Sequence, residues 1–132
     1  MRVLGVDYGR RKIGLALGDT DIRVASPMEV WLVDGTAEEL CERLSAFVIS
    51  EVIGGVVIGI PFRSDGSESA QTLENRQFAN LLRAHVRVPV VEVDESFTSK
   101  ESRRLQEEHG SRVPEDALAA MLILEEYFDR PA

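Results

Sequence analysis

The sequence has a single cysteine, only two histidines and no long apolar run. Cys41 cannot form an internal disulfide, which favours a reducing, cytoplasmic environment. No apolar segment approaches the roughly 20 residues that cross a bilayer, and the first residues lack the apolar core of a signal peptide. These absences predict a cytoplasmic protein with no membrane partner.

Several motifs of other enzyme classes are also missing. There is no histidine pair or Cys/His cluster of the kind that holds zinc, and no Gly-x-x-x-x-Gly-Lys-Ser/Thr loop that cradles nucleotide phosphates. The Gly-x-Ser-x-Gly turn of many serine hydrolases is absent as well. Any chemistry must therefore come from other residues, and carboxylates are the main candidates.

The net charge of −8 argues against a broadly basic nucleic-acid-binding protein. The charge is unevenly distributed, however. Residues 1–20 carry four basic side chains against two acidic ones, whereas acidic residues gather around positions 34–42, 107–108 and 125–126. The sequence is compatible with a small basic rim around one site, and it excludes a broad basic face.

The first third of the chain reads as three consecutive strands over residues 2–8, 13–18 and 23–33. Short turns separate them, so they are predicted to form an antiparallel meander. Pro27 cannot donate a hydrogen bond to a neighbouring strand, which predicts an edge strand or a bulge there. A helix should begin after Thr36, because Glu39 has the spacing of a capping box. Its apolar residues share one helical face: Ala37, Leu40, Cys41, Leu44, Phe47 and Val48.

Strands and helices alternate in the rest of the chain. Apolar strands are predicted over residues 55–60 and 88–93, with a helix between them and two further helices, from Ser99 to Gly110 and from Pro114 onward. Right-handed crossovers place both later strands on the free side of the first strand. The predicted fold is an α/β domain over residues 1–132. Its five-stranded mixed sheet is antiparallel in the first three strands and parallel later, with helices packed against it.

Three acidic residues are predicted to meet at one edge of this sheet. Asp7 ends the first strand, Asp94 and Glu95 follow the last strand, and Asp116 lies in the first turn of the final helix. Ligands of open α/β sheets gather beyond the carboxyl ends of the strands. Carboxylate oxygens suit hard divalent ions, which assist phosphodiester hydrolysis. Simpler roles stay open, since Asp7 can cap a turn and Asp116 can stabilise a helix N-terminus.

Basic residues lie next to these acids in the sequence. Arg10, Arg11 and Lys12 form the turn after Asp7 and could hold a phosphate backbone, although solvated turn cations are an equally good interpretation. Lys100 and Arg103 are three residues apart and share a face of the predicted helix after Glu95.

Taken together, six short segments closely resemble the YqgF family, also called RuvX, over nearly the whole chain. They are Leu4-Gly-Val-Asp-Tyr-Gly9 with Ile13-Gly-Leu-Ala16, Gly59-Ile-Pro61 with Asp65-Gly-Ser-Glu68, Asp94-Glu-Ser-Phe-Thr98, and Asp116-Ala-Leu-Ala-Ala120. The resemblance implies an RNase H-like fold with helices on both faces of the sheet.

The resemblance also implies a function. It assigns Asp7, Glu95 and Asp116 as catalytic and metal-binding residues of a nuclease that uses Mg²⁺ or Mn²⁺. The implied substrates are the precursor of 16S ribosomal RNA and branched DNA such as Holliday junctions. Two departures concern substrate binding. Ser96 stands where the family usually has arginine, and the loop 110–115 is short, with one basic residue.

Two other functions remain open at this stage. An actin-like ATP-binding protein also places Asp and Gly in a first hairpin, but it usually needs two lobes. A noncatalytic nucleic-acid- or protein-binding module could keep the same fold without the chemistry. The sequence does not distinguish a monomer from a homodimer, or RNA from branched DNA as the substrate.

Overall fold

The computed structural model describes residues 1–95, 107–108 and 113–130. The described strands and helices are β1 (Arg2–Tyr8), β2 (Lys12–Asp19), β3 (Val24–Leu32), α1 (Ala37–Ser50), β4 (Gly55–Pro61), α2 (Ala70–His85), β5 (Val90–Glu95) and α4 (Glu115–Phe128). The predicted helix over residues 99–110, with Lys100 and Arg103, falls almost entirely outside the described residues.

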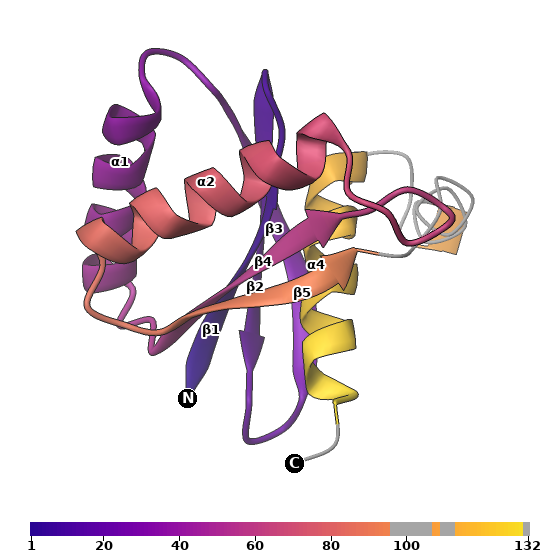
Figure 1. Cartoon of the computed structure of the whole chain (residues 1–132). Helices are drawn as coiled ribbons and strands as arrows, with labels where there is room; N and C mark the ends of the chain where they lie inside the picture. The colour runs from indigo at the N-terminus through magenta and orange to yellow at the C-terminus, as the bar shows by residue number, and fades with distance from the viewer. Residues whose placement is uncertain (96–106, 109–112, 131–132) are drawn as a thin grey trace.

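The five strands form one mixed sheet in the order β3-β2-β1-β4-β5 (Figure 1). β1 pairs antiparallel with β2, and β2 antiparallel with β3. β4 pairs parallel with β1 on its other side, and β5 parallel with β4. This arrangement confirms the predicted α/β fold, with both later strands on the free side of β1.

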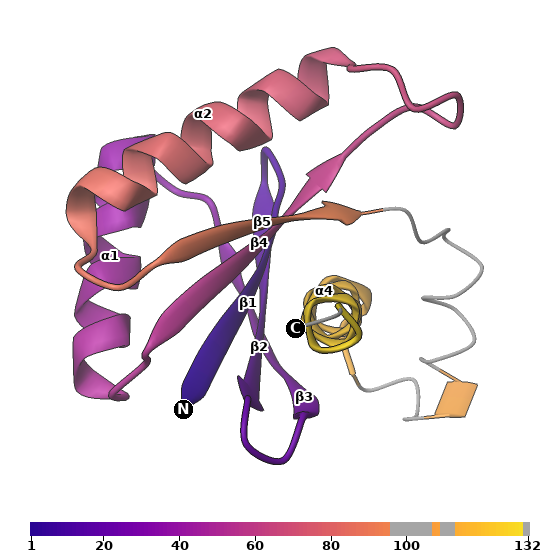
Figure 2. The same cartoon turned by 60° about the horizontal axis from the view of Figure 1, so that its bottom comes forward.

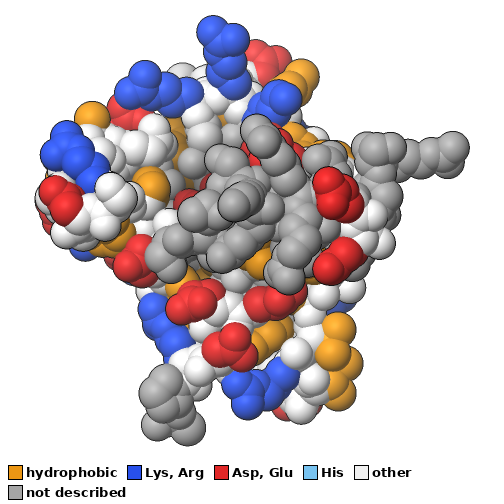
Figure 3. Space-filling model, turned by 90° about the vertical axis from the view of Figure 1, so that its right-hand side faces the viewer, with side chains coloured by type: hydrophobic (Ala, Val, Ile, Leu, Met, Phe, Trp, Pro, Cys, Tyr) orange, Lys and Arg blue, Asp and Glu red, His pale blue; other side chains and the backbone are white. Residues whose placement is uncertain are grey.

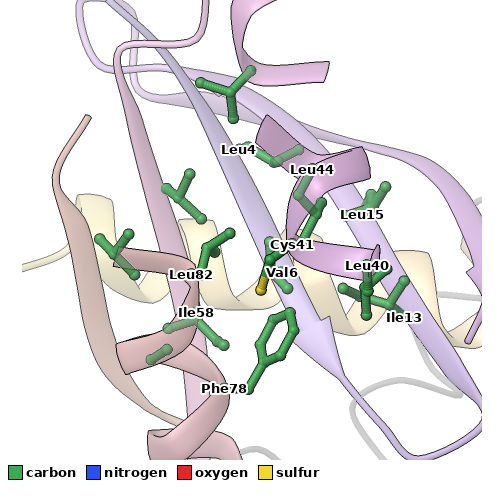
Figure 4. Packing of buried hydrophobic residues seen from close by; sticks show 14 of the residues in the cluster. Leu4, Val6, Ile13, Leu15, Leu40, Cys41, Leu44, Ile58, Phe78 and Leu82 are labelled. Carbon is green, nitrogen blue, oxygen red and sulfur yellow. The ribbon is translucent and has the colours of Figure 1, made fainter. Parts of the chain in front are cut away.

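Helices cover both faces of the sheet. α1 and α2 lie on one face and α4 on the other, as the end-on view of α4 shows (Figure 2). The face under α1 and α2 buries large aliphatic side chains, and Cys41 packs among them (Figure 4). The face under α4 forms a second cluster, in which Val3, Ala16, Val57 and Val93 contact the apolar side of the helix.

Local sequence signals account for most of the element boundaries. The Thr36 hydroxyl accepts a hydrogen bond from the Glu39 backbone N–H, and the Glu39 carboxylate accepts one from the Thr36 N–H, which completes the predicted capping box. Ser69 and Thr72 form a second capping box at the start of α2. Pro27 lies in edge strand β3, next to a bulge opposite Leu15 and Ala16, as predicted.

The last strand differs from its predicted bounds. β5 begins at Val90 and includes Asp94 and Glu95, instead of covering residues 88–93. Pro89 has no N–H to donate to the sheet, so regular pairing begins after it. Because β5 continues to Glu95 and pairs it with Pro61, this acid belongs to the sheet rather than to a following loop. In the part of the chain that the structure describes, no helix is long and apolar enough to cross a membrane.

Candidate active site

The alternation of side chains along the strands places two of the predicted acids on the same face. Asp7 is two and four residues from Gly5 and Val3, so all three point toward α4. Glu95 is two residues from Val93, which also packs under α4. Asp94 points the other way and is exposed. Of the adjacent pair on β5, only Glu95 can therefore join Asp7.

A glycine lets the two carboxyl groups meet across the intervening strand. Gly59 of β4 lies between β1 and β5, and a Cβ atom there would be only 3.0 Å from Oε2 of Glu95. Since Gly59 has no side chain, the Glu95 carboxyl group can extend over it. A hydrogen bond joins the carboxyl groups of Glu95 and Asp7.

Asp116 reaches the same edge from the first turn of α4. Gly14 of β2 pairs with Asp7, and a Cβ atom on Gly14 would lie 2.0 Å from the backbone oxygen of Asp116. The helix therefore begins in direct contact with the β1–β2 hairpin. The negative charge of Asp116 raises the pKa of both Asp7 and Glu95, so the Asp116 carboxylate lies within electrostatic range of the pair.

The proximity of these groups raises two pKa values. Burial raises the pKa of Asp7 to about 6, with a further rise from the charge of Asp116, while the hydrogen bond with Glu95 opposes the shift. Burial, the charge of Asp7 and their hydrogen bond raise the pKa of Glu95 to about 9. A hydrogen bond between two carboxyl groups requires a proton on one of them, and the higher pKa of Glu95 favours that residue as the donor. The pair thus holds a proton at neutral pH.

The donor set at this edge fits a hard divalent cation. Burial and mutual repulsion favour a proton between the two carboxyl groups, and a bound cation could replace that proton. Among the described residues, no three His, Cys, Asp or Glu side chains are close enough together to ligate one ion. Mg²⁺ is commonly bound by only one or two carboxylates together with substrate phosphates. Asp7 and Glu95 would therefore be the primary ligands, with Asp116 beside them.

The predicted basic residues of the hairpin are in two different situations. The Arg10 guanidinium donates from Nε and Nη2 to both carboxylate oxygens of Glu74, at 3.1 and 2.7 Å. Arg11 and Lys12 are exposed beside it. On the face of the molecule turned toward the viewer in Figure 3, basic side chains lie mostly around the margin and acidic ones nearer the middle.

The sequence analysis missed two buried polar residues of α2. Thr72 and Asn75 are almost completely buried, whereas Leu73, which is apolar, is 53% exposed. A signal for them exists in the spacing, because Thr72, Asn75, Ala79 and Leu82 recur at helical intervals on one face. A search restricted to apolar residues does not find this face.

Comparison with known proteins identifies the family. Residues 1–130 match the RuvX family, described as Holliday junction resolvase. The chain belongs to the RuvX family. The match covers nearly the whole sequence, so all three acids lie within the part that RuvX proteins share.

Curated relatives and solved structures agree with this assignment. Proteins named "Putative pre-16S rRNA nuclease" are similar over almost the full chain: one from Bordetella avium (strain 197N) is 38% identical over 98% of this chain and 96% of its own length. Another, from Anaeromyxobacter sp. (strain Fw109-5), is 37% identical over 98% and 97%. RuvC of T. thermophilus in complex with a Holliday junction substrate superposes with a TM-score of 0.65 and 17% identity, covering 97% of this chain and 93% of RuvC. This likeness confirms the RNase H-like fold.

Proposed function

We propose that this RuvX protein is a divalent-metal-dependent nuclease of the cytoplasm, with Asp7, Glu95 and Asp116 as its catalytic residues. The observation that carries the proposal is the hydrogen-bonded pair formed by Asp7 and Glu95 at the carboxyl edge of the sheet. Two carboxyl groups brought this close cost stability unless a proton or a cation lies between them. Family membership supports this function over an ATP-binding one.

The residues of the site would divide the work as follows. Asp7 and Glu95 would hold Mg²⁺ or Mn²⁺, and Glu95 must release its proton for the ion to bind. Once bound, the ion supplies the positive charge that activates water and stabilises the leaving oxygen of a phosphodiester. Asp116, at the start of α4, would complete the site when substrate phosphate binds. Arg11 and Lys12 would contact the phosphate backbone next to it.

We further propose the precursor of 16S ribosomal RNA as the substrate, with branched DNA as the second candidate. The names of relatives 31–38% identical to this chain support the RNA substrate. The family description supports the DNA junction. Both are phosphodiesters, so one active site could cleave either, and the nucleic-acid contacts decide between them.

A cleavage assay tests this function directly. The purified protein is incubated with 16S rRNA carrying a precursor extension and with a four-way DNA junction, in Mg²⁺, in Mn²⁺ and in EDTA. We expect cleavage with metal and none in EDTA. Asp7→Asn, purified in parallel, controls for contaminating nuclease. Equal cleavage by Asp7→Asn and wild type would contradict the proposal, as would wild-type cleavage in EDTA.

A further inference from the structure

The carboxyl ends of β1 and β4 separate at the site. The parallel ladder between the two strands ends at Val6 opposite Ile58. Beyond that point β1 stays paired with β2 as far as Tyr8, and β4 with β5 as far as Pro61. Asp7 therefore lies on one side of a widening gap, and the strand over which Glu95 extends lies on the other.

Asn75 of α2 spans this gap with its side-chain amide. Its Nδ2 donates to the backbone oxygen of Gly59 at 3.1 Å and, at a longer 3.5 Å, to that of Tyr8. Its Oδ1 accepts a hydrogen bond of 2.6 Å from Nε2 of Gln71, which holds the Asn75 nitrogen toward the two strands. The side chain is only 1% exposed. An amide thus links β1 and β4 where the backbone ladder has ended.

Thr72 lies one turn before Asn75 in α2 and forms a hydrogen bond to the end of β4. Its buried hydroxyl donates to the backbone oxygen of Pro61, the residue that pairs with Glu95. Asparagine and threonine are weak helix formers, and burying their polar groups costs free energy unless the hydrogen bonds are made. Each residue donates to backbone oxygens near the carboxyl ends of β1 and β4, while the Thr72 hydroxyl also takes part in the capping box with Ser69.

We propose that Asn75 and Thr72 are positioning residues, which fix the ends of β1 and β4 and so align Asp7 with Glu95. This inference rests on the proposed function of the site. Neither residue needs to touch substrate, because α2 covers the face of the sheet opposite to α4 and the acids (Figure 2). Their effect passes through the backbone at Tyr8, Gly59 and Pro61.

The test compares substitutions within α2. Asn75→Ala removes the amide, and Thr72→Val removes the hydroxyl with little change in volume, while Thr72→Ser keeps it. Leu82→Ala is the matched control, since Leu82 is fully buried on the same helix but contacts the apolar core. Each variant is measured below its unfolding temperature for kcat and KM, and for Mn²⁺ affinity by EPR in the absence of nucleic acid.

We expect Asn75→Ala to lower kcat by about 10–100-fold with KM changed less than about threefold, and to weaken Mn²⁺ binding by about 10-fold. Thr72→Val should lower kcat by about 10-fold, and Thr72→Ser should restore it. Leu82→Ala should lower the unfolding temperature and leave kcat and Mn²⁺ affinity near wild type. If Asn75→Ala fails to fold, the comparison of kcat between Thr72→Val and Thr72→Ser tests the positioning role.

Two outcomes separate the positioning role from the nuclease function. If the Asn75 and Thr72 variants lose only thermal stability, as Leu82→Ala does, the positioning role is wrong and the nuclease function stands. If wild type binds Mn²⁺ but cleaves neither substrate, the nuclease function is wrong. The Mn²⁺ affinities of the variants then still decide the positioning role.

Discussion

The two faces of the sheet are built from different kinds of residue. The face under α1 and α2 carries large aliphatic side chains, including Leu4, Val6, Ile13, Leu15 and Ile58. The face under α4 is rich in glycine, at positions 5, 14, 18 and 59, and a Cβ atom at any of these four would come within 3.0 Å of α4.

The difference follows from what each face must do. On the first face, side chains of ordinary size keep the helices at a normal packing distance and supply apolar burial. On the second, the missing side chains let α4 lie almost on the backbone of the sheet. Close approach brings Asp116 to the hairpin that carries Asp7 and leaves room for Glu95 to cross β4. One face stabilises the fold, and the other shapes the site.

Asp7→Asn should separate the stability of the fold from the activity of the site most strongly. It removes one charge from the acidic group and keeps the size of the side chain. Cleavage should fall by at least about a thousandfold, because the proposed cation loses a ligand. The metal-free protein should unfold at a higher temperature than wild type, since repulsion among the acids is relieved. Calorimetry in EDTA, together with the cleavage assay, measures both effects; a lower unfolding temperature would contradict the proposed cost of the acidic pair.

Gly14→Ala tests the close approach of α4. The new Cβ would meet the backbone of Asp116, which cannot move aside like the end of a flexible side chain. We expect a loss of about 3 kcal/mol in the free energy of unfolding, together with loss of cleavage. Gly55→Ala is the matched control, because its Cβ would have ordinary contacts of 3.6 Å or more. Urea denaturation should show Gly55→Ala within about 1 kcal/mol of wild type, and equal losses in both variants would refute the argument.

Leu15→Ala makes the reverse comparison. Leu15 follows Gly14 in β2, and its side chain points to the face under α1 and α2. Leu15 is fully buried in the cluster under α1 and α2. Its truncation should cost about 3 kcal/mol by leaving a cavity. Cleavage per folded molecule should nevertheless stay near wild type at a temperature where the variant is folded. A large fall in kcat would show that both faces control the site.

The pH dependence of metal-free stability should reflect the acidic pair. Both pKa values are raised on folding, so the folded state binds more protons than the unfolded state and loses stability as pH rises from about 5 to about 9. The unfolding temperature in EDTA should fall by several degrees over this range. Mg²⁺ should restore more stability at pH 9 than at pH 5, where protons occupy the site. The slope should be smaller in Asp7→Asn, and a slope equal to that of wild type would show that other groups cause it.

The smallest expected effect concerns the basic rim. Replacing Arg11 and Lys12 with alanine should weaken nucleic-acid binding and reduce the salt dependence of log Kd by about one to two units of slope. Arg10 is left in place because Glu74 already binds it. Arg2→Ala, at the opposite end of β1, should leave the slope unchanged. Fluorescence anisotropy at increasing NaCl provides the measurement, and an unaltered slope in the double variant would place the nucleic-acid surface elsewhere.

Local sequence patterns were enough to predict much of the fold of this protein. The strands, the capping box of Thr36 and Glu39, and the bulge near Pro27 depend on neighbouring residues, so their signals are contained in short segments. The order of the strands followed from general rules of chain connection. The acidic residues were also found from the sequence, because each lies at the end of a strand or the start of a helix.

The features of the site that local sequence patterns did not predict depend on residues far apart in the chain. That Glu95 reaches Asp7 depends on Gly59, and the approach of Asp116 depends on Gly14, since only packing reveals which glycines lie under α4. Asn75 resembles a surface residue in the sequence, yet its amide is buried between two separating strands. The sequence by itself determined the elements and the chemical types at their ends. Only the tertiary structure decided which of those groups share a proton, because carboxyl groups interact strongly only when they are close and shielded from water.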